Sequence, residues 1–232
     1  MDELTDLPEL TTLIEPALDM NIELYFDDTQ SGARGEQGSG SADNPETIVV
    51  KPGELLVVNS LSPRKVTEVL RAILGIRKAP VGSIALLGED LGSIGRIRAQ
   101  KLRRRLGISC GPVELVSELT VRENLALPCI LKKYSKKQIR LRVERIADAF
   151  CFDELMDLSV GRLGFAERRM VMLGRALSHD PELAILETPL VGLDEFNRNL
   201  AAQEIQRLPI SGAAALVFND TSVELETSDS AD

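Results

Sequence analysis

The sequence has few of the residues from which disulfide frameworks and metal sites are built. Its 232 residues include one histidine, His179, and three cysteines, Cys110, Cys129 and Cys151, with no Cys-x-x-Cys spacing. An odd number of dispersed cysteines does not form a disulfide framework, and a single histidine does not complete a zinc site. We therefore expect no metal site and a reducing compartment, the cytoplasm.

The sequence also lacks a long apolar run and an excess of positive charge. No stretch reaches the roughly 18 consecutive apolar residues of a membrane span, and the N-terminal residues are acidic instead of basic and then apolar. Lys and Arg number 27 against 36 Asp and Glu, a formal net charge of -9. Such a chain repels nucleic acid and anionic headgroups in general. We expect no nucleic-acid partner, and membrane association only through another protein.

What the sequence does contain is an alternation of strand-like and helix-like segments. Two β-branched runs, 46–50 and 54–59, are separated by a Lys-Pro-Gly turn, and apolar residues then recur at helical spacing from Val66 to Ile76. The last third continues in the same way, with helices over about 167–178 and 194–208 and strands over 183–187 and 213–218. This order predicts an α/β fold with a mainly parallel sheet flanked by helices.

Six segments in order resemble the ATP-binding-cassette (ABC) ATPase family, from about residue 22 to residue 220. They are VKPGELLVV, LRAILGI, VGSIALLGEDL, LRRRLGIS, ELTVRENLALP and GRALSHDPELAILETPLVGLD. The resemblance implies a P-loop NTPase-like fold with a helical subdomain. It divides the chain into a lead-in (1–20), a RecA-like core (21–108 and 160–220), a helical subdomain (109–159) and an acidic, disordered tail (221–232).

The family's phosphate-binding loop, G-x-x-x-x-G-K-[ST], falls in this register on residues 60–67, SLSPRKVT. Both glycines are replaced, and Val66 stands where the lysine that contacts the phosphates belongs. Lys65 is one residue early, while Thr67 keeps the hydroxyl of a magnesium ligand. Tyr25 lies near the family's adenine-stacking aromatic, although a strand tyrosine also has a structural explanation. We expect at most a vestigial ATP site at Tyr25, Lys65 and Thr67.

The other catalytic positions of the family are replaced as well. Gly111 stands at the Q-loop glutamine, Glu187 at the Walker B aspartate, Thr188 at the catalytic glutamate and Asn219 at the switch histidine. A threonine hydroxyl has no useful basicity near neutral pH. The signature L-S-G-G-Q corresponds to Leu163, Gly164, Phe165, Ala166 and Glu167. We therefore predict no catalytic residue at these positions.

Two further positions have competing explanations. Asp194 matches the family's D-loop and would help a dimer interface, but an aspartate after a strand and turn is equally a helix N-cap. His179 precedes an Asp-Pro pair, and we expect a surface turn there.

Taken with the resemblance, these replacements predict a pseudo-ATPase that is not an enzyme and has a structural or regulatory role in a membrane transport complex. We expect no required cofactor and at most weak ATP and Mg²⁺ binding. The resemblance implies an integral membrane, permease-type partner, a homodimer or a heterodimer with an ABC ATPase, and a cytoplasmic position at the inner face of the membrane. The wording LTVRENLALP is similar to ATPases of lipid and lipoprotein transporters. Two alternatives stay open, a soluble adaptor that reuses the fold and an active transporter ATPase with unusual motifs.

Overall fold

The computed structural model describes residues 22–25, 47–59, 61–77, 84–111 and 113–218, whose strands form two four-stranded sheets. The antiparallel sheet has the order β2-β1-β4-β5 and consists of β1 (Ile22–Tyr25), β2 (Thr47–Val50), β4 (Ile84–Leu86) and β5 (Glu89–Asp90). The parallel sheet has the order β3-β8-β7-β6 and consists of β3 (Leu55–Val58), β6 (Leu106–Ser109), β7 (Leu183–Glu187) and β8 (Ala214–Phe218).

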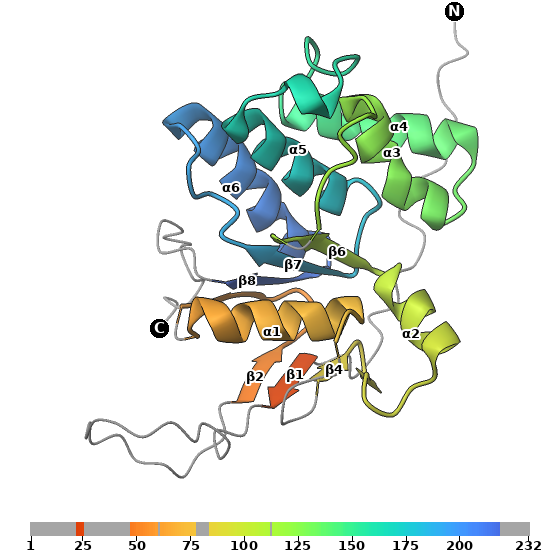
Figure 1. Cartoon of the computed structure of the whole chain (residues 1–232), viewed down its shortest axis with the longest axis vertical. Coiled ribbons are helices and arrows are strands. Elements are labelled where there is room, and N and C mark those ends of the chain that lie inside the picture. The colour runs from red at the N-terminus through yellow and green to blue at the C-terminus, as the bar shows by residue number, and fades with distance from the viewer. Residues whose placement is uncertain (1–21, 26–46, 60, 78–83, 112, 219–232) are drawn as a thin grey trace, which may run out of the picture.

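Helices cover both faces of the parallel sheet (Figure 1). They are α1 (Pro63–Leu74), α2 (Arg96–Arg103), α3 (Val121–Leu131), α4 (Lys136–Ala149), the 3₁₀ helix η1 (Val160–Arg162), α5 (Phe165–Leu177) and α6 (Glu195–Ile210). In Figure 1, α1 lies between the two sheets, α5 and α6 lie on the opposite face, and α3 and α4 lie beyond α5. No helix among the described residues is long and apolar enough to span a membrane. The predicted α/β fold class is confirmed.

Local capping signals explain where several helices begin. Thr120 and Glu123 form a capping box at the start of α3, and Ser135 and Gln138 form another at the start of α4. Helix α1 starts at Pro63, because proline suits the first helical position. The helix thus begins three residues before Val66, the residue at which the apolar spacing first indicated it.

Two apolar clusters fill the two faces of the parallel sheet. One lies between α1 and the sheets and includes Val66, Val69, Leu70 and Ile73, all fully buried. The other lies between the sheet and α3, α4, α5 and α6. All five residues of β8 are buried, as expected for a central parallel strand covered on both faces. The predicted subdomain limits stay predictions, and residues 1–20 and 221–232 lie outside the described residues.

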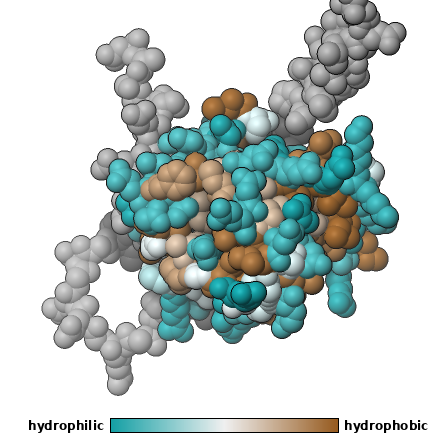
Figure 2. All heavy atoms as spheres, turned by 90° about the horizontal axis from the view of Figure 1, so that it is seen from above, coloured by the Kyte–Doolittle hydropathy of each residue, from teal (hydrophilic) through white to brown (hydrophobic). Residues whose placement is uncertain are grey.

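The outer face of the helical region is mainly hydrophilic, with hydrophobic patches between the polar side chains (Figure 2). On α3 and α4, the exposed large apolar side chains are Ile130, Leu131 and Leu141.

The prediction of a surface turn at His179 is wrong. His179 is 3% exposed, and its Nε2 donates to the carbonyl oxygen of Leu106 at 3.1 Å. The turn is covered by the end of α3, because Nζ of Lys132, the residue that follows this helix, donates to the carbonyl oxygen of His179 at 3.0 Å. Burial, together with the Lys132 charge, lowers the pKa of His179 to about 4.

Candidate functional site

The register of the parallel sheet brings the predicted site residues to one edge. Val58 of β3 pairs with Phe218 of β8, and Phe218 pairs with Glu187 of β7. Leu186, one residue before Glu187, pairs with Ser109, the last residue of β6. The segment that follows β6 therefore starts at the same edge of the sheet. All four strands therefore end together, and in open α/β sheets this carboxyl edge is where ligands bind.

Helix α1 begins at this edge, after a connection of four residues, 59–62. The Ser62 hydroxyl oxygen accepts a hydrogen bond from the Lys65 N–H at 3.4 Å, and the Thr67 hydroxyl donates to the Pro63 carbonyl oxygen at 2.9 Å. Val66, predicted at the lysine position, is fully buried in the cluster beneath α1. The Thr67 hydroxyl is therefore engaged within its own helix, and Val66 serves the core.

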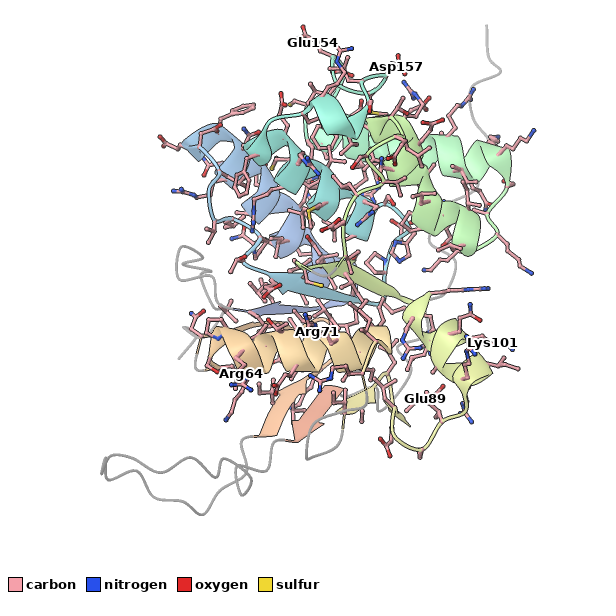
Figure 3. All side chains as sticks on the ribbon, viewed as in Figure 1. Arg64, Arg71, Glu89, Lys101, Glu154 and Asp157 are labelled. Carbon is pink, nitrogen blue, oxygen red and sulfur yellow. The ribbon has the colours of Figure 1, made fainter. Side chains whose placement is uncertain are left out.

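The start of α1 is nevertheless positively charged. Figure 3 shows Arg64 at the first turn, and its side chain is 90% exposed and 3.6 Å from Glu68. Lys65 follows it, half-buried. A helix N-terminus with two adjacent cations favours a bound anion such as phosphate.

Glu187 links the end of β7 to the segment after β6. Its Oε2 accepts a hydrogen bond from the Gly111 N–H at 3.0 Å, so two predicted site positions, Gly111 and Glu187, are in direct contact. The Glu187 charge also acts on the neighbouring Cys110, whose pKa burial and this carboxylate raise to about 12. A carboxylate at this edge is the kind of oxygen ligand that Mg²⁺ takes.

Thr188 is hydrogen-bonded to β8 and to α5. Its N–H donates to the Phe218 carbonyl oxygen at 2.9 Å, and its φ of 46° lies in the left-handed region. Arg169 Nη2 donates to the Thr188 carbonyl oxygen and, at 3.0 Å, to its hydroxyl oxygen. The residue predicted at the catalytic glutamate position is thus bonded to a guanidinium from α5. Sequence reasoning missed Arg169, because a second arginine in a helix carries no signal of what it contacts.

The signature-like segment forms the start of α5. Gly164 N–H donates to the Glu167 carboxylate at 2.7 Å, so Glu167 caps its own helix. Phe165 is 66% exposed and lies against Gly192, where an added Cβ would be 2.7 Å from the ring and φ is 79°. Of the other two members, Leu163 is buried and Ala166 half-buried. The structure therefore brings this segment next to the predicted D-loop within one chain.

Asp194, the other D-loop position, is the N-cap of α6. Its carboxylate accepts from the Asn197 N–H at 2.9 Å and from Asn197 Nδ2 at 2.8 Å. These hydrogen bonds hold the pKa of Asp194 below its ordinary value. A role in a dimer interface stays a prediction. Asn219 lies outside the described residues, as does the side chain of Tyr25, whose backbone belongs to β1.

A buried arginine that sequence reasoning also missed holds the segment between Gly111 and α3. Arg175 of α5 is 7% exposed and donates to the carbonyl oxygens of Glu114 at 2.9 Å and Val113 at 3.2 Å. Asn124 of α3 accepts from the Val116 N–H at 2.9 Å and donates to its carbonyl oxygen at 3.0 Å. The segment that starts at the Glu187 contact is thus fastened to both helices.

The arrangement fits a magnesium nucleotide in part. The positive start of α1 suits phosphate groups, and Glu187 suits a divalent cation. Val66 supplies neither charge nor hydrogen bond, and Thr188 is already bonded to Arg169.

A parallel sheet with α1 starting at its carboxyl edge, and helices α3 and α4 on α5, fits the class of ATP-binding cassettes. Comparison supports this class, since the model of the family described as ABC transporter matches residues 64–191, more than half of the chain. The chain belongs to the ABC transporter family.

Curated relatives and solved structures agree with this membership. A Nod factor export ATP-binding protein I of Burkholderia thailandensis is 30% identical over 177 residues, which are 76% of this chain and 57% of that protein. A methionine import ATP-binding protein of Bacillus cereus is 29% identical over 162 residues, 68% of this chain and 46% of that protein. This chain thus spans about half the length of these relatives. The structure of an ATP-binding subunit of an ABC transporter has a TM-score of 0.70 at 19% identity, covering 88% of this chain and 80% of that one.

The expectation that the chain is not an enzyme is wrong. The relatives are named as ATP-binding proteins of export and import systems. A further similar structure is of an ATP-binding cassette in a post-hydrolysis state with ADP and Pi (TM-score 0.66, 18% identity, 87% of this chain and 88% of that one). Family membership points to an ATPase, and replaced motif positions alone do not establish a pseudo-ATPase. The roles predicted for single residues stay predictions.

Proposed function

We propose that the chain is the ATP-binding, ATP-hydrolysing subunit of an ABC transport complex. The observation that carries this proposal is the contact between Glu187 Oε2 and the Gly111 N–H at 3.0 Å. It places a carboxylate at the edge where the strands end and couples it to the segment that leads into the helical subdomain. A subunit that converts nucleotide binding into movement needs such a connection between the two regions.

The residues that would hold the nucleotide belong to two elements. The first turn of α1, with Arg64 and Lys65, would hold phosphate oxygens, and Thr67 lies in the next turn. Glu187 would hold Mg²⁺, which supplies charge neutralisation on the phosphates when bound. The chain's own residues position this carboxylate, because Gly111 fixes one of its oxygens.

The remaining features of the proposal follow from the family. The partner is an integral membrane subunit of permease type, and the cassette pairs with a second cassette, of the same or another kind. The cassette then sits at the inner face of the membrane, in the cytoplasm. The cargo stays a prediction, as the relatives named above serve Nod factor export and methionine import, and a lipid cargo has only the sequence wording behind it.

Calorimetric titration with Mg-ATP, followed by phosphate-release assays, tests the proposal. We expect a Kd between about 10 µM and about 1 mM, which corresponds to about -7 to about -4 kcal/mol. Glu187→Gln keeps an acceptor for Gly111 but loses the charge, so Mg²⁺-dependent binding and hydrolysis should fall at least about tenfold. Glu154→Gln is the matched control, because Glu154 is an exposed carboxylate at the outer end of the helical region (Figure 3).

No heat of binding at millimolar Mg-ATP, with the purified chain or with its partner present, would contradict the proposal. Purification of the tagged chain from membranes addresses the partner. Capture of a permease-type subunit supports a transport complex, whereas a stable partner that is not a membrane protein supports the adaptor that the sequence left open.

A further inference from the structure

A groove of about 730 Å³ runs along α2, away from the candidate nucleotide site. Helix α2 ends three residues before β6 begins, so the groove lies at the amino end of the parallel sheet. The candidate site lies at the opposite, carboxyl edge. The groove is therefore separate from the candidate nucleotide site.

The groove is strongly basic in a chain whose net charge is -9. Residues 96–105 contain six basic side chains and no acidic one. Two of them are neutralised, Arg98 by Glu89 at 2.5 Å and Arg105 by Glu182 at 2.6 Å. Within the described part of the chain, no carboxylate lies within ion-pair distance of the other two basic side chains that line the groove, Arg96 and Lys101. Figure 3 shows Glu89 and Lys101 on the same side of the molecule.

The groove also offers apolar contact. Ile97, which lines it, is 73% exposed, and the wall behind it is the buried Leu102. An exposed isoleucine between unpaired cations favours a ligand that has both carboxylates and apolar side chains, because each part then finds its complement.

The chain itself contains such a ligand in residues 1–21. This segment has no lysine or arginine. Its carboxylates are Asp2, Glu3, Asp6, Glu9, Glu15 and Asp19, and its large aliphatic residues are Leu4, Leu7, Leu10, Leu13, Ile14 and Leu18. The composition matches the groove in charge and in apolar character.

The antiparallel sheet attaches this segment beside the groove. In β1, Glu23 pairs with Ala85 of β4, and the same register leads from Ile22 toward Leu86. Leu86 in turn pairs with Glu89, which lines the groove. Tethering at this point gives the segment an effective concentration on the order of millimolar. A span of 21 residues reaches up to about 70 Å, so distance does not prevent the contact.

We propose that residues 1–21 bind in the α2 groove, with their carboxylates on Arg96 and Lys101 and their leucines against Ile97. The contact joins the start of the chain to the antiparallel sheet and to α2. A second basic surface, Lys133, Lys136 and Lys137 beside and on α4, is the competing destination. The groove is favoured because α4 lies on the far face of the parallel sheet from β1 (Figure 1).

Zero-length carbodiimide cross-linking of the full chain, read by mass spectrometry, tests the proposal. We expect amide links from Lys101 to carboxylates of residues 1–21. Arg96→Glu should lower their yield at least about threefold, as should salt near 1 M, because both weaken the charge attraction. Lys137→Glu, the same charge change on α4, should leave the yield unchanged. Thermal melting of both variants checks that the fold is retained, since both side chains are exposed.

Three outcomes would overturn the proposal. One is that the segment links to Lys133, Lys136 or Lys137 in place of Lys101. Another is that the Lys101 links are as abundant in Arg96→Glu as in the original chain. The third comes from an equal mixture of isotope-labelled and unlabelled chains, in which about half of the Lys101 links joining differently labelled peptides would show that the segment binds a second copy, whereas links within one chain give none.

Discussion

The two faces of the parallel sheet are built from different kinds of side chain. The cluster beneath α1 consists of apolar residues, among them the fully buried Val66. The helical face instead buries polar and charged groups. Among the described residues, the buried polar side chains are Ser109, Asn124, Arg175, Ser178, His179 and Glu204, and all but Ser109 of β6 belong to helices α3, α5 and α6 or to the turn after α5.

The difference shows which face joins separate segments of the chain by buried hydrogen bonds. The α1 face is held by packing, so a charge there has no partner. On the helical face, Arg175 and Asn124 hold the segment that leads from Gly111 to α3. Burial of these polar groups is tolerated because each is hydrogen-bonded. On the α1 face, adding a charge should therefore destabilise the fold, whereas on the helical face removing a charge should do so.

The largest expected effect comes from placing a charge in the α1 face. Val66→Lys restores the family's lysine but buries an ammonium beneath α1, and we expect the free energy of unfolding to fall by about 3–5 kcal/mol. Urea denaturation measures it, with Arg64→Lys as the exposed control on the same helix turn. A Val66→Lys chain of unchanged stability that bound Mg-ATP more tightly would show that this position faces the nucleotide.

The next effect comes from removing a charge on the helical face. Arg175→Met leaves the carbonyl oxygens of Val113 and Glu114 without their donor, and we expect a loss of about 2–3 kcal/mol in urea denaturation. Arg168→Met, an exposed arginine on the same helix, should change stability by less than about 0.5 kcal/mol. Equal effects of the two substitutions would refute the linking role of Arg175.

A pH dependence should follow from the buried histidine of the helical face. The folded-state pKa of His179 is about 4, below its ordinary value, so the unfolded chain binds the proton first as the pH falls. Stability from this group is complete above about pH 6.5 and is lost toward about pH 4, with about 2 kcal/mol lost between about pH 7 and about pH 5. Urea midpoints at the two pH values measure it. His179→Gln should remove this part of the slope, and an unchanged slope would assign it to other groups.

The smallest effect, with no change in stability, distinguishes the faces by thiol chemistry. Each face has one buried cysteine, Cys110 under α1 and Cys129 on α3, while Cys151 is exposed. Burial raises the pKa of both buried thiols, that of Cys110 to about 12. We expect iodoacetamide to modify one thiol per folded chain at about pH 8 and three after unfolding. Rapid modification of Cys110 or Cys129 in native conditions would show that its face opens.

The fold was predictable because the spacing of apolar residues and the helix-capping residues indicate the same elements. Helical spacing of apolar residues located α1, and the capping residues at the starts of α3 and α4 are visible as Thr-x-x-Glu and Ser-x-x-Gln. The helical spacing also included Val66, which the motif register placed at the position of the family's phosphate-contacting lysine. The structure agrees with the helical spacing, because Val66 is buried.

The contacts of the candidate site were only partly predictable. Gly111 and Glu187 were placed by motif register, but their hydrogen bond depends on β6 and β7 being neighbours. Arg169 and Arg175 donate hydrogen bonds to backbone carbonyl oxygens. Every residue has such a carbonyl, so the sequence does not indicate which one an arginine contacts. His179 was mispredicted for a similar reason, since its turn is covered by Lys132, the residue that follows α3.

The position of β8 has a consequence for the order in which the protein forms. This strand comes last among the described strands, yet it lies between β3 and β7, and its Ala215 pairs with Leu55. A chain emerging from the ribosome must therefore keep the edges of β3 and β7 unpaired until residue 218 is made. Such long-range parallel pairing is slow and leaves strand edges open to aggregation. The edges of β3 and β7 that later face β8 are therefore the part of this sheet most open to non-native pairing while the protein folds.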